Sequence, residues 1–389
     1  MIRHKIKYVL LSLCLLSFFS ACDKSEPDPG PEPPAPGSPA PRTVLVYMIA
    51  DNNLYLNASR NLEQMLAGAS ARNLNNGNLV VYVDSKRETP QLLQIKAKAD
   101  GTIIKESVVD YEEQNSADPE IMKGIIEDVI ARFPAESYGL ICWSHGTAWM
   151  PQNAGNMTRS FGDDDGNMLE LDQLKEAIPN PEGDKKFDFI LFDACYMGST
   201  EVAFALKDKA DYFIGSPNEI LSYGFPYDRI VKRMFTATAD LRGICEDFYN
   251  WYNEGNNKYA TISLTATKEM DALAANLREI TRNHRDEIQS LPLSQIQALD
   301  YLYSKRVLYD LEDYVKNLAT PEEYARFQSI LSNTVLYKVC TDYSYYANKG
   351  TVKNDASRFS GLTIYIMDQF PLLDDWYKQL DWYKAVYED

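Results

Sequence analysis

Apolar runs alternate with amphipathic stretches through the first half of the chain. Residues Thr43–Ala50 are almost continuously apolar, which is typical of a parallel strand covered on both faces. Similar runs predict strands at Leu79–Asp84, Tyr138–Ser144, Phe187–Ala194 and Tyr212–Ser216. Helical periodicity between them predicts helices at Tyr55–Ala69, 119–133 and Glu170–Ile178. Strands separated by helices predict an α/β fold, a mostly parallel sheet inside a three-layer α/β/α sandwich.

The pattern loosens after Pro226. Helices are predicted at 239–254, 267–289, 295–318 and 321–332, and strands at Ala260–Thr265, Thr334–Cys340 and Gly361–Met367. Residues 151–168 are polar and rich in Gly, Asn and Asp, so we expect a long loop there. The pattern therefore predicts a sandwich core over 43–235, continued over 236–389 by a helical region with a few added strands.

The N-terminus has the features of a secretory signal. Basic residues precede an apolar segment at Tyr8–Phe19, and small residues then lead to Cys22. The end of residues 1–22 is similar to a bacterial lipobox, in which cleavage leaves the cysteine to carry lipid. A plain signal peptide with a chance cysteine is the alternative. Residues 23–42 are mostly Pro, Gly, Ser and acid, which predicts an extended spacer between a lipid anchor at the cell envelope and the globular part.

Charge and composition exclude several classes of protein. The chain has 39 Lys and Arg against 56 Asp and Glu, a net charge of −17, so nucleic acid is not an expected partner. The only long apolar run is at the N-terminus, which argues against several membrane spans. Beyond Cys22 there are four scattered cysteines and two histidines, a composition that suits neither a disulfide scaffold nor a zinc site.

Chemically potent residues end two consecutive predicted strands. One strand leads into His145-Gly146, and the next leads into Asp193 and Cys195. If these strands are neighbours, imidazole and thiol meet beyond the carboxyl ends of the sheet, where sites of open α/β sheets lie. A nearby imidazole can take the thiol proton and produce a nucleophile that attacks a carbonyl carbon. The second histidine, His284, lies on an apolar helical pattern, and we interpret it as structural.

The other cysteines fit structural positions. Cys142 lies inside an apolar strand, Cys245 on a helical apolar stripe, and Cys340 at the end of a strand pattern. Cys195 is thus the candidate nucleophile.

The chain resembles the clostripain-like cysteine peptidases, which share the caspase and gingipain type of α/β/α sandwich. The resemblance rests on four stretches, TVLVYMIADNNL (43–54), YGLICWSHG (138–146), FDFILFDACYMGSTEVAFAL (187–206) and DYFIGSPNEILSYGFPYD (211–228). They cover the first half of the exported chain, and the C-terminal half offers no comparable motif. The resemblance implies a cysteine endopeptidase acting on proteins or peptides, with no cofactor required for its chemistry.

The resemblance also implies roles for individual residues. Cys195 is the expected nucleophile, His145 the general base and acid, and the main chain of Gly146 and Cys195 the oxyanion hole. Asp193 matches a family position in the S1 pocket that selects Arg or Lys. The alternative is that its carboxylate orients a loop or caps the next helix. Ser216 and Tyr223 are expected at the substrate, but some relatives carry a second pocket Asp where this chain has Tyr223, which leaves the basic preference open.

Members of the family often mature by self-cleavage between the histidine and cysteine strands. Arg159-Ser160 is the only basic candidate bond in the predicted loop there, and an intact surface loop is the alternative. The same loop carries Asp163 and Asp165. Clostripain is linked to calcium, for which carboxylates are suitable ligands, although acidic loops are more often simply solvated.

Two other functions remain open at this stage. One is a non-catalytic surface lipoprotein, expected to be monomeric like the peptidase, that keeps the fold and binds peptide or glycan. The other is a serine hydrolase using Ser144 or Ser199, which ranks last because no G-x-S-x-G motif surrounds either residue.

Overall fold

A computed structural model of the chain describes residues 38–151, 160–301, 306–367 and 371–388. The fold is built around a nine-stranded sheet in the order β12-β10-β9-β8-β5-β1-β2-β3-β4. Its strands are β1 (Thr43–Ala50), β2 (Asn78–Ser85), β3 (Glu88–Ala97), β4 (Ile103–Asp110), β5 (Tyr138–Trp143), β8 (Phe187–Asp193), β9 (Ala210–Gly215), β10 (Thr261–Ala266) and β12 (Val335–Cys340). The five central strands are parallel, and the two at each edge are antiparallel to their neighbours.

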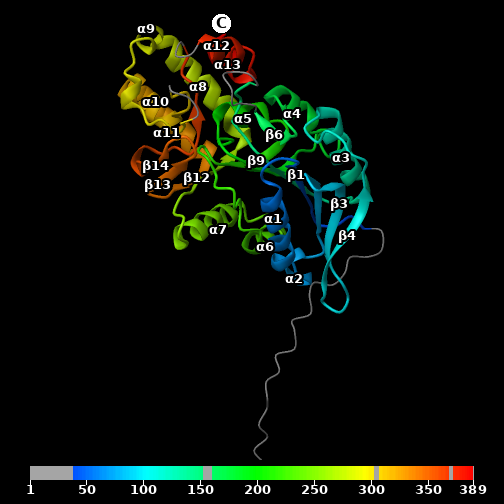
Figure 1. The fold of residues 1–389 in the computed structure, drawn as a ribbon. Coiled ribbons are helices and arrows are strands. Elements are labelled where there is room, and N and C mark those ends of the chain that lie inside the picture. Colours follow the sequence, from blue (N-terminus) through cyan, green and yellow to red (C-terminus); the bar gives the residue numbers. More distant parts are fainter. Residues whose placement is uncertain (1–37, 152–159, 302–305, 368–370, 389) are drawn as a thin grey trace, which may run out of the picture.

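Helices cover both faces of this sheet, as predicted (Figure 1). Alternate residues of β1 separate the two layers, since Val44 and Val46 face one apolar core and Leu45 and Tyr47 face the other. The first core is covered by α1 (Tyr55–Gly68), α2 (Ala71–Leu74), α6 (Tyr227–Met234) and α7 (Leu241–Glu254). The second is covered by α3 (Pro119–Arg132), α4 (Leu171–Ala177), α5 (Thr200–Ala205), α8 (Met270–Asn283), α10 (Leu311–Leu318), α11 (Pro321–Thr334), α12 (Pro371–Tyr377) and α13 (Asp381–Tyr387).

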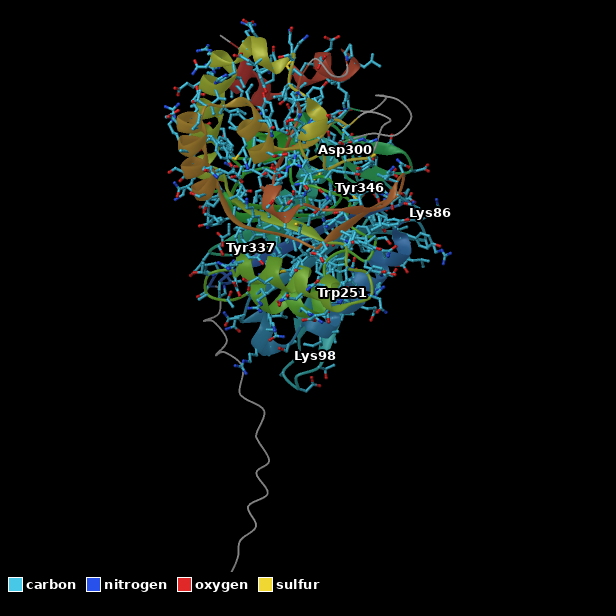
Figure 2. The ribbon with its side chains drawn as sticks, turned by 90° about the vertical axis from the view of Figure 1, so that its left-hand side faces the viewer. Lys86, Lys98, Trp251, Asp300, Tyr337 and Tyr346 are labelled. Atoms are coloured by element: carbon cyan, nitrogen blue, oxygen red, sulfur yellow. The ribbon has the colours of Figure 1, made fainter. Side chains whose placement is uncertain are left out.

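The C-terminal region is not a separate layer, because it contributes β10 and β12 to the central sheet. Three small two-stranded sheets complete the described chain. They pair β6 (Phe161–Asp164) with β7 (Asn167–Leu169), β11 (Tyr309–Asp310) with β15 (Thr363–Ile364), and β13 (Tyr343–Tyr346) with β14 (Gly350–Lys353). Tyr346 of β13 is labelled in Figure 2, above Trp251 of α7.

The long loop predicted over 151–168 is wrong for its second half, because β6 and β7 form a hairpin there. Asp165 and Gly166 are the two turn residues, both with positive φ (42° and 91°). Asp-Gly is the residue pair that suits a two-residue hairpin turn. The carboxylate of Asp163 accepts a hydrogen bond from Gly166 N at 3.0 Å and closes the turn. The acidic residues 163–165 are therefore part of a hairpin and its turn.

The predicted helix 295–318 is also wrong for residues 296–301 and 306–310, the described part before α10. Asp310 accepts a hydrogen bond from Asp313 N at 3.1 Å and caps α10, which therefore begins at Leu311. Asp300 accepts hydrogen bonds from the backbone N–H groups of Val307 and Leu308, an arrangement of a loop rather than of a helix. Predicted strand 361–367 shortens to β15.

The predicted helix 267–289 is divided at His284. Thr267–Glu269 forms a 3₁₀ turn, α8 ends at Asn283, and α9 (Arg285–Ile288) follows. His284 Nε2 lies 2.7 Å from Glu323 Oε2, so this histidine joins α8 to α11 in a structural role.

Arg42, just before β1, makes a group of contacts at the amino ends of the parallel strands, which we call the Arg42 clamp. The guanidinium of Arg42 pairs with Asp188, at 2.9 Å between Nη2 and Oδ2. It also donates to the carbonyl oxygens of Met234 and Thr236, each at 2.9 Å. Arg42 is only 6% exposed, so this group of contacts fixes the start of β1 against β8 and the end of α6. Within the described residues, no helix is long and apolar enough to cross a membrane.

Candidate active site

The ends of β5 and β8 bring His145 and Cys195 to one edge of the sheet. The two strands are parallel neighbours with Trp143 opposite Asp193, so each candidate residue lies two positions beyond the paired register. Their loops touch through the main chain, because a Cβ added to Gly146 would lie 2.7 Å from the carbonyl oxygen of Cys195. A residue without a side chain is therefore required beside the candidate nucleophile.

His145 is held from the adjacent strand β1. Its Nε2 lies 2.7 Å from Oδ1 of Asn53, in the loop that follows β1. Burial lowers the pKa of His145, and the carboxylate of Asp163 opposes that shift. The imidazole is half-buried, so it is neutral at physiological pH and able to accept a proton.

The sulfur of Cys195 is in hydrogen-bond contact with main-chain groups of the segment after β9. Ile220 N donates to Sγ at 3.3 Å, and Sγ lies 3.5 Å from Ile220 O. Burial raises the pKa of the Cys195 thiol to about 12, and the nearby carboxylate of Glu219 adds to the increase. Within the described chain, no hydrogen bond joins this sulfur to His145. The site is thus organised but holds a protonated thiol.

The turn after Cys195 is strained and tied down. Tyr196 has a positive φ of 62°, which a bulky side chain rarely adopts. Its N–H donates to Asn218 O at 2.9 Å, and its hydroxyl donates to Glu219 Oε1 at 2.8 Å. Glu219 in turn accepts from Ala347 N at 2.9 Å. These contacts hold the turn after Cys195 against the segment that follows β9.

The hairpin β13–β14 contacts the segment after β9 through Asn218. Asn218 donates through Nδ2 to Ser344 Oγ and to Tyr346 Oη, both at 2.8 Å. Ser216 is fully buried beneath it and lies 2.7 Å from Thr261 Oγ1. The predicted role of Ser216 in substrate binding stays a prediction, and in this structure its hydroxyl joins the end of β9 to the start of β10.

Asp193 is buried under the loop 223–227 rather than open to solvent. Its Oδ2 accepts hydrogen bonds from Phe225 N and Tyr227 Oη, both at 3.0 Å, and the residue is 5% exposed. Gly224 covers the carboxylate closely, since an added Cβ would lie 2.6 Å from Oδ2. Burial raises the pKa of Asp193 to about 6. In this state the carboxylate orients a loop, the alternative that the sequence had left open.

Tyr223 stands at the margin of that loop. Its half-buried ring lies 4.9 Å from the guanidinium carbon of Arg60 and 6.0 Å from the ring of Trp251. The ring face of Tyr223 is therefore in contact with the guanidinium of Arg60.

The two candidate serines have structural roles. Ser144 Oγ donates to Ile49 O at 2.8 Å and is buried. Ser199 caps α5 and donates to Glu201 Oε2 at 2.5 Å. Neither hydroxyl is paired with an imidazole, so a serine nucleophile has no support.

The described residues contain no group of three or more His, Cys, Asp or Glu side chains that could hold a metal ion. Asp163 closes the β6–β7 turn, and Asp165 occupies it. The predicted cleavage position Arg159 and the predicted lipid carrier Cys22 lie outside the described residues. The four described cysteines, Cys142, Cys195, Cys245 and Cys340, are free thiols.

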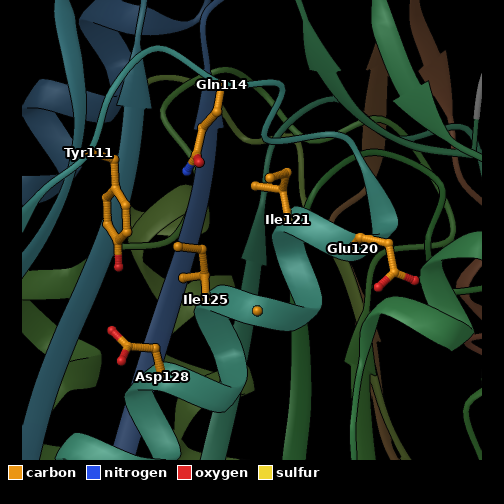
Figure 3. A pocket seen from close by; sticks show the side chains of 7 residues that line it. Tyr111, Gln114, Glu120, Ile121, Ile125 and Asp128 are labelled. Carbon is orange, nitrogen blue, oxygen red and sulfur yellow. The ribbon is translucent and has the colours of Figure 1, made fainter.

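A small surface pocket lies elsewhere, along the start of α3 (Figure 3). Its lining includes Tyr111, Gln114 and Asp128, but none of the residues at the ends of β5 and β8. Asp128 is already paired with Arg132 at 2.6 Å. We therefore do not assign the chemistry to this pocket.

Sequence reasoning missed three residues of the site, Asn53, Glu219 and Ile220. Asn53 could have been found, because a polar Asp-Asn-Asn run directly follows the first strand, and the carboxyl ends of parallel strands meet at one edge. Glu219 and Ile220 carry no local signal, since their contact with Cys195 depends on how the segment after β9 folds back.

Comparison with known proteins gives consistent relatives. The sequence profile of the clostripain family, Peptidase C11, matches residues 46–389. Clostripain of Hathewaya histolytica is 26% identical over 226 residues, which is 49% of this chain and 42% of clostripain. The match thus spans less than half the length of that relative.

Solved structures are similar over almost their whole length. An inactive zymogen C11 protease from Parabacteroides distasonis has 40% identity and a TM-score of 0.80, covering 90% of this chain and 99% of its own. A secreted C11 cysteine protease from Bacteroides thetaiotaomicron, in complex with an irreversible peptide inhibitor, has 32% identity and a TM-score of 0.78, covering 90% and 100%.

Proposed function

Because the chain belongs to the clostripain family of cysteine endopeptidases, we propose that it cleaves peptide bonds with Cys195 as nucleophile and His145 as general base and acid. The observation that carries this proposal is the pairing of β5 with β8, which places both residues at one edge with their loops in main-chain contact. No cofactor is required, because thiol and imidazole supply both nucleophile and proton transfer.

The chemistry follows acyl transfer. The thiol proton of Cys195 moves to His145, and the thiolate attacks the scissile carbonyl carbon. The N–H groups of Gly146 and Cys195 donate to the resulting oxyanion. Neither of these donates to another residue in the described chain. The intermediate expels the amine, which takes the proton from the imidazolium, and water activated by His145 hydrolyses the thioester.

Selection of substrate rests on Asp193 at the floor of the S1 pocket. An ionised carboxylate there pairs with the guanidinium or ammonium of a P1 Arg or Lys. Such pairing requires Gly224 and Phe225 to withdraw from the carboxylate, because they cover it in this structure. We expect the ring of Tyr223, which already contacts the guanidinium of Arg60, to border that pocket.

The contact between Cys195 and Ile220 makes the described state a latent one. We propose that cleavage after Arg159 activates the enzyme. Ser160, the residue after that bond, accepts a hydrogen bond from Thr147 N at 3.0 Å, and Gly162 N donates to His145 O at 3.0 Å. Cutting the chain there would free a strand that is paired directly with the histidine loop.

The same proposal places the enzyme at the cell envelope. Lipid on Cys22 anchors it, and the Pro-rich residues 23–42 separate a monomeric catalytic part from the membrane. Protein or peptide substrates are therefore met outside the cytoplasm.

One experiment tests these points together. Intact mass and N-terminal sequencing of the wild-type protein and of Cys195→Ala report processing after Arg159, and a peptide panel varied at P1 reports specificity. We expect a split wild type that prefers Arg or Lys, and an intact, inactive Cys195→Ala. Wild-type protein that cleaves no peptide and is not labelled by a thiol-reactive peptide analogue would instead be the non-catalytic binder.

A further inference from the structure

The polar loop after β1 reaches the catalytic edge. Strand β1 is the parallel neighbour of β5, with Met48 opposite Trp143, so the residues beyond Ala50 lie beside those beyond Trp143. Asn53 of this loop places Oδ1 2.7 Å from His145 Nε2. Within the described residues, this contact with Asn53 is the only hydrogen bond that the imidazole of His145 makes.

The loop that carries Asn53 is itself fixed. Asn52 donates through Nδ2 to Ile49 O at 3.1 Å and to Asp163 O at 2.7 Å, and its Oδ1 accepts from Leu54 N at 2.8 Å. Asp165 N also donates to Asp51 O at 3.0 Å. These contacts fix the backbone next to Asn53 to β1 and to the β6–β7 hairpin, and from there its exposed side chain reaches His145.

The chemistry of the contact decides where the imidazole carries its proton. An amide oxygen only accepts hydrogen bonds, so Nε2 must carry the hydrogen. In a neutral imidazole the lone pair is then at Nδ1. The same hydrogen bond persists when the ring becomes an imidazolium, because Nε2 is protonated in both states.

We propose that Asn53 is a positioning residue, whose amide oxygen holds His145 in the tautomer with Nδ1 free to take the thiol proton of Cys195. This inference rests on the proposed function, in which His145 is the base. It adds a third residue that acts through the histidine and does not touch substrate.

An uncharged acceptor orients the ring without an added carboxylate next to it. The carboxylate of Asp163 in β6 acts electrostatically on His145. The loop after β1 also carries Asp51, and the loop after β8 carries the thiol of Cys195. Asp163 already raises the pKa of His145 against the effect of burial. A second carboxylate at position 53 would raise it further and leave the base protonated near neutral pH.

The test compares Asn53→Ala and Asn53→Asp with Ser59→Ala, an exposed control on α1 whose hydroxyl contacts only Tyr55 O. We expect Asn53→Ala to lower kcat about tenfold to a hundredfold with KM changed less than about twofold, since general acid–base catalysis contributes roughly 10²–10⁴-fold. Asn53→Asp keeps the acceptor, so we expect it to rescue the tautomer. It should also move the acid limb of the kcat profile about one pH unit upward.

A second readout does not depend on proteolysis. Nitrogen-15 NMR of the histidine rings in a Cys195→Ala background reports the tautomer directly, and His145→Gln assigns the signal. We expect the Nε2–H form in the parent and in Ser59→Ala, and a mixture of tautomers in Asn53→Ala. Asn53→Ala that matches the control in both kcat and tautomer overturns the inference while leaving the peptidase intact. If the wild type cleaves no peptide, the proposed function fails and the NMR result still decides the role of Asn53.

Discussion

Replacing Gly146 by Ala tests whether the histidine and cysteine loops are in contact. The new Cβ would lie 2.7 Å from Cys195 O and 3.1 Å from both Ala194 Cβ and Met197 Cγ. Ordinary contacts begin at 3.4 Å, so the two loops must separate by about 0.7 Å. The atom in the way is main-chain oxygen, which cannot rotate aside as a flexible side chain would.

Two magnitudes follow from this separation. Forcing an extra methyl group into a packed site costs about 1–3 kcal/mol of unfolding free energy. A displacement approaching 1 Å between reacting groups lowers the rate by up to about a hundredfold. We therefore expect kcat to fall roughly 10–100-fold, with a smaller change in KM because substrate contacts outside the loops persist.

The assay measures kcat and KM on a peptide with Arg at P1, together with chemical denaturation. Gly124→Ala is the matched control, because Gly124 is exposed on α3 and an added Cβ meets nothing within 4 Å. That control should keep full activity and gain about 0.5–1 kcal/mol, the usual benefit of Ala over Gly in a helix. A Gly146→Ala enzyme with wild-type kcat and stability would refute the argument that these loops touch.

The remaining predictions concern three carboxylates, those of Asp193, Glu219 and Glu201. Asp193→Asn should abolish selection of Arg or Lys at P1, as measured with the peptide panel varied at P1, because it removes the charge that pairs with the basic side chain. The pKa of Asp193 in the folded protein, about 6, exceeds its ordinary value of 3.8. The contribution of Asp193 to stability is therefore full below about pH 4 and is lost as pH rises to 6. The loss is roughly 3 kcal/mol, measured by denaturation at a series of pH values. Glu219→Gln removes the charge that raises the pKa of the Cys195 thiol, and iodoacetamide should label the thiol about three- to tenfold faster at pH 8. Glu201→Ala removes the carboxylate that accepts hydrogen bonds from Tyr365 N and Tyr377 Oη in the core, and urea denaturation should show a loss of about 3 kcal/mol.

The centre of the fold could be predicted because its signals are local. The apolar runs of β1, β5 and β8 are long, and Pro119 with its Asp118 cap marks the start of α3. The antiparallel edge strands β3 and β4 could not be recognised, because polar and charged residues interrupt the apolar ones in both and no long apolar run remains. A strand at the edge of a sheet needs less apolar surface, so its pattern is weaker.

The candidate site likewise has a part that could be predicted from sequence and a part that could not. The place of His145 and Cys195 beyond one edge of the sheet could be predicted, because each follows one of two neighbouring buried strands. The state of the site is set by contacts between segments distant in sequence, such as Ile220 on Cys195 and Phe225 on Asp193. Such contacts depend on loop conformation, for which residue type gives no periodic pattern.

The clamp formed by Arg42 has a consequence for how the molecule is held. Arg42 binds at the amino ends of β1 and β8, while His145 and Cys195 lie beyond the carboxyl ends of the same parallel sheet. The eight residues of β1 separate these two edges by about 26 Å. In the proposed lipid-anchored enzyme, tension along the residues before Arg42 would therefore be taken up by its buried ion pair and carbonyl contacts. The candidate catalytic residues would lie at the opposite edge of the sheet from the anchor.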